Sequence, residues 1–133
     1  MPWSAGPPTG LIQSASESIG SGNSIVLLAG TINVKGIKLW SLSISSAMSS
    51  VGGGPGSSFV VDDTVSDNTG TQYLACEIGL PSGTESGSTN SVSQDMAGIV
   101  LPAGATLSLN NGGAGGTSSL HRCSATVIYS ILY

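Results

Sequence analysis

The chain has 133 residues, a length typical of a single domain. Only 8% of the residues are charged, against about 25% in an average soluble domain, and the net charge is −4 with three basic residues: Lys35, Lys38 and Arg122. A nucleic-acid-binding surface needs several cations to neutralise phosphates, and anionic membranes attract clusters of basic side chains. We therefore expect neither a nucleic-acid nor a membrane partner.

The first ten residues, MPWSAGPPTG, contain three prolines and one tryptophan. Proline fixes φ and favours an extended neighbour, so residues 1–10 are predicted to form an extended N-terminal arm that reaches about 30 Å. A tryptophan left in water wastes its apolar area. We expect Trp3, Pro7 and Pro8 to contact a neighbouring subunit or the surface beneath it. The segment lacks the basic and apolar regions of a signal peptide, which predicts synthesis and assembly in the cytoplasm.

Short segments of alternating or β-branched residues fill the rest of the chain and indicate strands. The predicted strands, in chain order, are residues 11–19, 24–30, 36–47, 58–65, 71–80, 95–101, 105–110 and 119–133. Loops rich in Gly, Ser and Asn are predicted at 49–58, 81–91 and 110–119, and "SDNTG" (66–70) is predicted to be a hairpin turn.

Alternation within these strands places one set of side chains on the inward face. Residues 36–47 show it most clearly, with Trp40, Leu42 and Ile44 on one face and serines on the other. Pro102 and Gly104 are predicted to form a tight turn between a strand filled by Ile99 and Leu101 and the strand that follows. The predicted structural core consists of Trp40, Leu42, Ile44, Leu74, Cys76, Ile78, Leu107, Leu109, Val127 and Tyr129.

The order of these elements indicates the fold class. About eight strands with long loops, and no segment of helical periodicity, predict an all-β protein with an antiparallel β-sandwich of jelly-roll-like type. No linker or internal repeat divides the chain. We therefore expect the arm at 1–10 to be followed by one β-sandwich domain at 11–133.

Residues able to support catalysis or metal binding are few. The single histidine, His121, shares a strand face with Cys123, but nothing in the sequence orients its ring, so we interpret it as structural. Asp62, Asp63 and Asp67 form the one acidic cluster. The spacing of a calcium loop is absent and the first two point to opposite faces of a strand, so a solvated strand end and turn is favoured, with calcium binding left open.

The two cysteines, Cys76 and Cys123, occupy inward positions and are predicted to be reduced, apolar core residues. Zinc would need about four ligands, which these residues do not supply. The glycine-rich stretches lack the lysine and the following helix of a phosphate-binding loop. We expect no catalytic, cofactor-binding or metal-binding residues, and a protein that is not an enzyme.

Three stretches in order, "SIVLLAGT", "KGIKLWSLSISSA" and "MAGIVLPAGATLSLNN", followed by a terminal strand, resemble small phage virion proteins of the capsid decoration (cement) and head-fibre group. The resemblance covers about residues 24 to 133. It implies a jelly-roll or related β-sandwich fold, a homotrimer, and a place in the virion. The partners it implies are identical subunits and the major capsid protein or another virion component.

The function implied by this resemblance is structural. A protein that binds only the assembled shell stabilises that shell by mass action. The alternative is a phage tail or fibre-tip module whose loops at 49–58, 81–91 and 110–119 recognise a host-surface glycan or protein.

Overall fold

The computed structural model describes residues 11–20, 22–49, 59–80, 88–112 and 120–133. Within these ranges the chain forms eight strands and one short 3-10 helix, η1 (Gly30–Ile32). The strands are β1 (Ile12–Gly20), β2 (Ser24–Leu28), β3 (Ile37–Ser49), β4 (Phe59–Asp67), β5 (Gln72–Leu80), β6 (Ser88–Leu101), β7 (Leu107–Asn110) and β8 (Leu120–Ile131). The predicted all-β class is confirmed. The arm predicted at residues 1–10, with Trp3, Pro7 and Pro8, lies outside the described residues.

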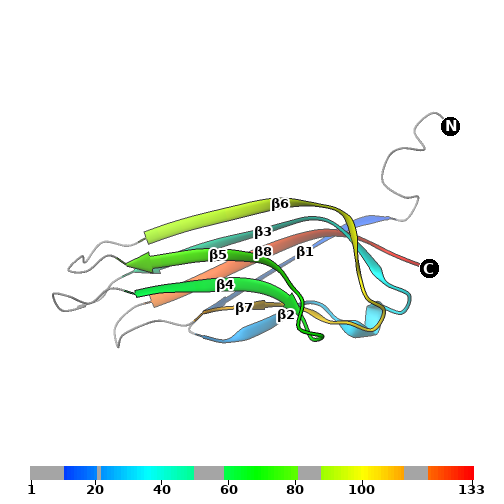
Figure 1. Cartoon of the computed structure of the whole chain (residues 1–133), viewed down its shortest axis with the longest axis horizontal. Coiled ribbons are helices and arrows are strands. Elements are labelled where there is room, and N and C mark those ends of the chain that lie inside the picture. Colours follow the sequence, from blue (N-terminus) through cyan, green and yellow to red (C-terminus); the bar gives the residue numbers. More distant parts are fainter. Residues whose placement is uncertain (1–10, 21, 50–58, 81–87, 113–119) are drawn as a thin grey trace.

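The strands form two antiparallel four-stranded sheets that pack as a sandwich (Figure 1). Sheet A has the strand order β1-β8-β3-β6, and sheet B has the order β2-β7-β4-β5. Successive strands alternate between the two sheets, except that β4 and β5 are neighbours joined by a tight turn. This winding is that of a jelly-roll-like sandwich, and it pairs β8 with both β1 and β3, which are far away in the sequence.

The core lies between the sheets and follows the period of two. Inward-facing residues of sheet A pack against inward-facing residues of sheet B. Among the predicted core positions, those that the structure places in the interior are Leu42, Ile44, Leu74, Cys76, Ile78, Leu107, Leu109, Val127 and Tyr129. A buried leucine or isoleucine contributes about 1.5–3 kcal/mol relative to an exposed one, so this cluster supplies most of the driving force for folding.

The two ends of the sandwich differ in how the strands are connected. At one end, which we call the turn end, β1, β3, β5 and β7 begin and the described connections 29–36, 68–71 and 102–106 are short. At the opposite end, which we call the loop end, β1, β3, β5 and β7 finish (Figure 1). The connections that follow β3, β5 and β7 at the loop end lie largely or wholly outside the described residues.

The placement of Trp40 in the core is wrong. A β-bulge makes Trp40 an extra residue in β3, so that Leu39 opposes Tyr129 of β8 and Ser41 opposes Ile128. Leu39 and Leu42 face inward, and Trp40 and Ser41 between them are only partly buried. The indole lies on the outer side of sheet A, where its Nε1 donates a hydrogen bond to Ser130 Oγ at 2.9 Å.

Gly98 makes room for the displaced indole. A Cβ at Gly98 would lie 3.0 Å from Trp40 Cζ3. The residue also has φ +76°, a backbone conformation that residues other than glycine rarely adopt. Its neighbour Ala97 also has a positive φ, of 53°. The positive φ angles in β6 therefore occur opposite the bulge in β3, where the strand has to leave room for the indole.

Two further expectations about β6 need correction. Ile99 pairs with the buried Leu39, but it is 47% exposed because β6 is an edge strand with a neighbour on one side only. The strand also begins at Ser88 rather than at residue 95. Residues 88–91 at its start were predicted as loop from composition, yet serine and threonine fit well on the solvated face of an edge strand.

Candidate binding surfaces

A polar cluster is buried between the sheets near the loop end, and Asp63 of β4 is its centre. Asp63 is fully buried and its Oδ2 accepts a hydrogen bond from Ser46 Oγ at 2.5 Å and lies 2.7 Å from His121 Nε2. Its Oδ1 accepts a hydrogen bond from the backbone N–H of Gly112 at 2.8 Å. Ser46 and His121 belong to sheet A, so this carboxylate holds the two sheets together.

Asn111 closes the loop end above this cluster. Its Oδ1 accepts a hydrogen bond from Gly22 N at 3.0 Å, and its Nδ2 donates to the carbonyl of His121 at 3.4 Å and to Cys123 Sγ at 3.5 Å. Gly112 must be glycine, because a Cβ there would lie 2.4 Å from the carbonyl oxygen of Asp62. Gly112 therefore lies close against the backbone of β4, and its N–H reaches the carboxylate of Asp63.

Serine, histidine and aspartate occur together here, but their connections differ from those of a nucleophilic triad. Ser46 donates to Asp63 rather than to the imidazole, and all three side chains are almost inaccessible to solvent. A buried charged group needs hydrogen-bond partners to offset its desolvation, which this arrangement provides. The cluster is therefore a structural cross-link, consistent with the structural interpretation of His121.

The two cysteines are buried and unpaired. Burial raises the pKa of the Cys123 thiol to about 12, and the nearby negative charge of Asp63 adds to the shift. A thiol with so high a pKa is a poor nucleophile at neutral pH. Both cysteines belong to the buried core cluster and pack as small apolar side chains.

The acidic residues predicted as one cluster serve separate purposes. Asp62 is exposed, whereas Asp63 points inward, as the alternation predicted. Asp67 holds the β4–β5 turn through bonds from the Thr69 hydroxyl (2.6 Å), the Tyr73 hydroxyl (2.7 Å) and the backbone N–H of Thr69 (2.8 Å). No group of three or more potential metal ligands occurs in the described part of the chain.

These bonds set the pKa of Asp67. Burial alone would raise it, but the hydrogen bonds donated by the Thr69 and Tyr73 side chains and by the backbone of Thr71 and Thr69 outweigh burial and hold the pKa at about 2. For Tyr73, burial and the bond to Asp67 raise the pKa. The Asp67 carboxylate is therefore ionised over the ordinary pH range and can accept these hydrogen bonds throughout it.

The outer face of sheet A carries an array of hydroxyl groups. The pairing of its four strands puts outward-facing residues into rows that cross the whole sheet. One row is Ser18, Ser124, Ser45 and Ser91, and the next is Ser16, Thr126, Ser43 and Ser93. Neighbouring strands lie about 4.8 Å apart, so each row spans roughly 15 Å.

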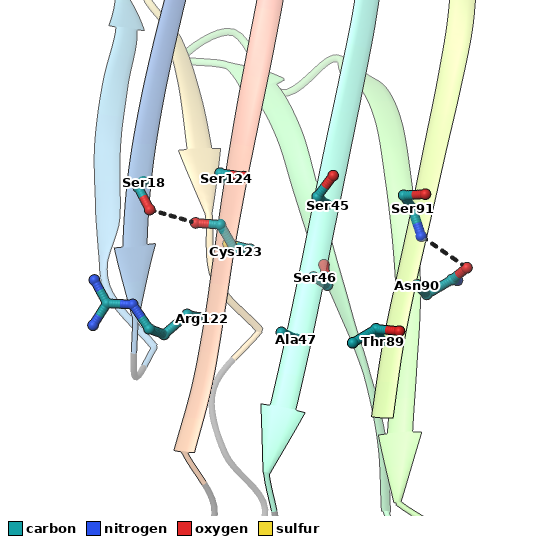
Figure 2. A pocket seen from close by; sticks show the side chains of 10 residues that line it. All are labelled: Ser18, Ser45, Ser46, Ala47, Thr89, Asn90, Ser91, Arg122, Cys123 and Ser124. Carbon is teal, nitrogen blue, oxygen red and sulfur yellow. Dashed lines mark hydrogen bonds between the residues drawn. The ribbon is translucent and has the colours of Figure 1, made fainter. Parts of the chain in front are cut away.

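Figure 2 shows a hollow of about 580 Å³ on this face, at the half nearer the loop end. Its lining residues come from all four strands of sheet A. Arg122 lies at its rim and is the one charged side chain among the described residues that line it. Arg122 and the hydroxyls of Ser45, Ser91 and Ser124 make no hydrogen bond to any other residue that the structure describes, so these groups are available to a ligand.

A second hollow, of about 600 Å³, lies on the same face toward the turn end. Trp40, Ile12 and Ile128 line it together with Ser43 and Thr126 of the hydroxyl array. Lys38 Nζ lies 5.9 Å from the centre of the Trp40 ring. The outer face of sheet A thus changes from hydroxyl-lined to partly apolar along the strands.

Exposed apolar side chains gather at the turn end of the sandwich. Strand pairing brings the start of β3 beside the ends of β6 and β8, and the segment that precedes β3 carries two of these side chains. Apart from Ile12 and Ile128 in the second hollow, the exposed large apolar residues described at this end are Leu11, Ile32, Val34, Ile99, Val100 and Tyr133. We call these six residues the apolar end patch.

Comparison with known proteins adds no family to these observations, because neither a protein-family model nor a curated protein sequence matches the chain. In the described part of the chain no helix is long and apolar enough to cross a membrane. Alternation alone pointed to the serines of β3 on one face. The full array could not be found from the sequence, because it depends on which strands pair.

Proposed function

We propose that this protein is a structural virion protein, a capsid decoration or cement protein that attaches by its turn end to copies of itself and to the assembled shell. The apolar end patch is the observation that carries the proposal. Three of its members, Leu11, Val34 and Tyr133, are 71%, 73% and 88% exposed. A gathering of exposed apolar side chains at one end of a protein usually marks an interface.

The scarcity of charge supports permanent packing against protein. Burying an unpaired charge at an interface is costly, and only 8% of the residues in the chain are charged. At about 25 cal/mol per Å² of buried apolar area, covering several aliphatic side chains in each of three subunits would offset much of the cost of association. A homotrimer bound to a symmetric shell multiplies this contribution, because each additional site adds to the avidity.

One observation favours the alternative function, a tail or fibre-tip module that binds a host-surface glycan or protein. The connections that follow β3, β5 and β7 all leave from the loop end, opposite to the apolar end patch. Recognition loops commonly cluster at one end of such a scaffold. In both functions the turn end attaches and the loop end faces outward.

The experiment combines light scattering after size-exclusion chromatography with co-sedimentation on capsids of the virus that encodes the protein. The proposal predicts a trimer and capsid binding that saturates. The double variant Val34→Lys/Val100→Lys should lose both, because each lysine would have to be buried unpaired. Val60→Lys, at a position 64% exposed at the loop end, is the matched control and should retain both.

Two outcomes contradict the proposal. One is a wild-type monomer that stays in the supernatant with capsids at all concentrations tested. The other is a double variant that assembles and binds like wild type. Deleting residues 1–9, the predicted arm, should weaken self-association or attachment while leaving the fold intact, and undiminished binding would remove the arm from the proposal.

A further inference from the structure

We propose that the outer face of sheet A is a binding site for an uncharged oligosaccharide that lies along the strands from Arg122 to Trp40. This inference goes beyond the structural role proposed above and does not depend on it. It concerns a different surface, and it holds for a protein placed on a shell, a tail or a fibre.

The dimensions of the face favour a narrow ligand over a protein. The two rows and the Arg122 position beyond them span roughly 15 Å across the strands and about 14 Å along them, or about 200 Å² in plan, whereas a stable protein interface needs about 800 Å² per partner. Each of the two hollows, of about 580 and 600 Å³, falls within the size range of small-molecule sites. Because Ser43 and Thr126 of the second hollow lie one row along the same sheet face from Ser45 and Ser124 of the first, a chain-like ligand could occupy both.

The chemistry of the hydroxyl array also argues against a protein partner. Serine is depleted in protein–protein interface cores, since its short side chain buries little apolar area and its hydroxyl then needs a partner. Each hydroxyl can both donate and accept a hydrogen bond. A sugar hydroxyl has the same property, so the unpaired groups of Ser45, Ser91 and Ser124 can bond to it in either direction.

Charge favours a neutral saccharide over an acidic one. The whole chain has a net charge of −4, which disfavours approach of an anion. Arg122 lines the first hollow and Asp95 lines the second, so the two hollows together carry one charge of each sign. The guanidinium can donate two parallel hydrogen bonds to adjacent sugar hydroxyls.

Trp40 supplies the contact that a hydroxyl array lacks. Sugars present apolar C–H faces, and the part of the indole that lines the second hollow offers a rigid apolar surface. The bulge in β3 is what turns Trp40 to the outer face, and bulges frequently re-aim side chains beside functional sites. The face therefore offers hydrogen-bonding groups at one end and an apolar platform at the other, the combination usual in small-molecule sites.

The test uses the full-length protein in a Trp3→Phe background, so that Trp40 is the fluorescent reporter. Maltohexaose, cellohexaose, chitohexaose and a β-galactan hexasaccharide are titrated, with a sialic acid hexamer as the acidic comparison. Binding is followed by tryptophan fluorescence and by amide NMR shifts, and at least one neutral sugar is expected to bind with Kd of about 0.1–1 mM. The shifted amides should belong to β1, β8, β3 and β6.

Variants locate the site. Arg122→Gln, and Ser45→Val together with Ser124→Val, should each weaken binding about tenfold, the first by loss of charge-assisted bonds and the second by filling the hollow. Lys35→Gln is the matched charge control, and Ser108→Val, on the other sheet, is the matched serine control. Both variants should change Kd less than about twofold, because neither Lys35 nor Ser108 lines the two hollows.

Three results would overturn the proposal. The first is no shift on sheet A with any neutral hexasaccharide up to about 10 mM, where even weak specific binding would be visible. The second is tighter binding of the sialic acid hexamer than of the neutral sugars. The third is binding that Arg122→Gln and the serine double variant leave unchanged. None of these results affects the predicted trimer or capsid attachment, which depend on the apolar end patch.

Discussion

The two ends of the sandwich reach stability by opposite means. At the loop end the interior is polar, with Asp63 held by Ser46, His121 and the backbone of Gly112, while the outer face of sheet A beside it carries hydroxyl groups. At the turn end the interior is largely aliphatic, with Asn33 and Asp67 as its buried polar residues, and several exposed side chains are apolar too. Hydrogen bonds between the sheets therefore contribute more to stability at the loop end, and packing contributes more at the turn end.

Asn33 is a buried polar side chain within the mainly aliphatic turn end. It is fully buried, and its Nδ2 donates to the carbonyls of Pro102 at 2.6 Å and Ala105 at 3.0 Å. Its Oδ1 accepts no hydrogen bond from the residues that the structure describes. This amide helps to tie the 102–106 connection to the segment before β3, together with the bonds from Gly104 N–H to the Asn33 carbonyl and from Gly30 N–H to Thr106 Oγ1.

Removing the centre of the loop-end network should have the largest effect. Asp63→Ala removes the carboxylate that the buried Ser46 hydroxyl, the buried His121 ring and the N–H of Gly112 share. We expect a loss of about 3–5 kcal/mol in the free energy of unfolding, as for other disrupted buried pairs, and a fall in Tm of at least about 10 °C. Urea unfolding measures it. The control is Asp62→Ala, on the same strand but exposed, which should stay within about 0.5 kcal/mol of wild type. Equal effects of the two variants would show that the network contributes nothing.

The bulge at the turn end predicts that a leucine matters more than its larger aromatic neighbour. Leu42→Ala removes a fully buried side chain and should cost about 3 kcal/mol. Trp40→Ala removes a half-buried indole on the outer face and should cost about 2 kcal/mol. Thermal unfolding of both variants under one set of conditions compares them. A larger cost for Trp40→Ala would mean that the indole is a core residue after all.

The β4–β5 turn should make stability depend on acid. The pKa of Asp67 is about 2 in the folded protein, against about 3.9 in an unfolded chain. A lowered folded pKa means that the contribution is complete above about pH 5 and is lost as the pH falls from about 4 to about 2. We expect Asp67→Asn to remove about 1–2 kcal/mol at neutral pH and to flatten this part of the pH profile. Asp62→Asn should keep the wild-type slope, and a wild-type slope in Asp67→Asn would contradict the assignment.

The smallest effect on stability is expected at the apolar end patch. Val34 is 73% exposed, so Val34→Lys should leave the free energy of unfolding within about 0.5 kcal/mol of wild type when the protein is dilute. Under conditions where wild type self-associates, the same variant should lose the concentration dependence of Tm that association confers. Calorimetry over a range of protein concentrations checks both statements. A large destabilisation at low concentration would place Val34 in the fold rather than in an interface.

Sequence patterns succeeded where the relevant physics is local. Alternation with a period of two placed Leu42, Ile44 and Val127 on inward faces, and the separation of Asp62 from Asp63 followed from the same rule. The alternation rule failed at Trp40, because one extra residue in a strand moves the residues before it to the opposite face from the one that alternation predicts. It also failed for the first half of β6, where a solvated strand has the composition of a loop.

The sequence by itself determined the β class, the alternation of inward and outward residues and the near absence of charge, since each depends on residue type and near neighbours in the chain. Only the tertiary structure decided that β8 lies between β1 and β3, which lines up serines from four strands in continuous rows. It also decided that Asp63 meets His121, 58 positions away. Contacts between distant segments are selected by the packing of both sheets at once, so no local pattern specifies them.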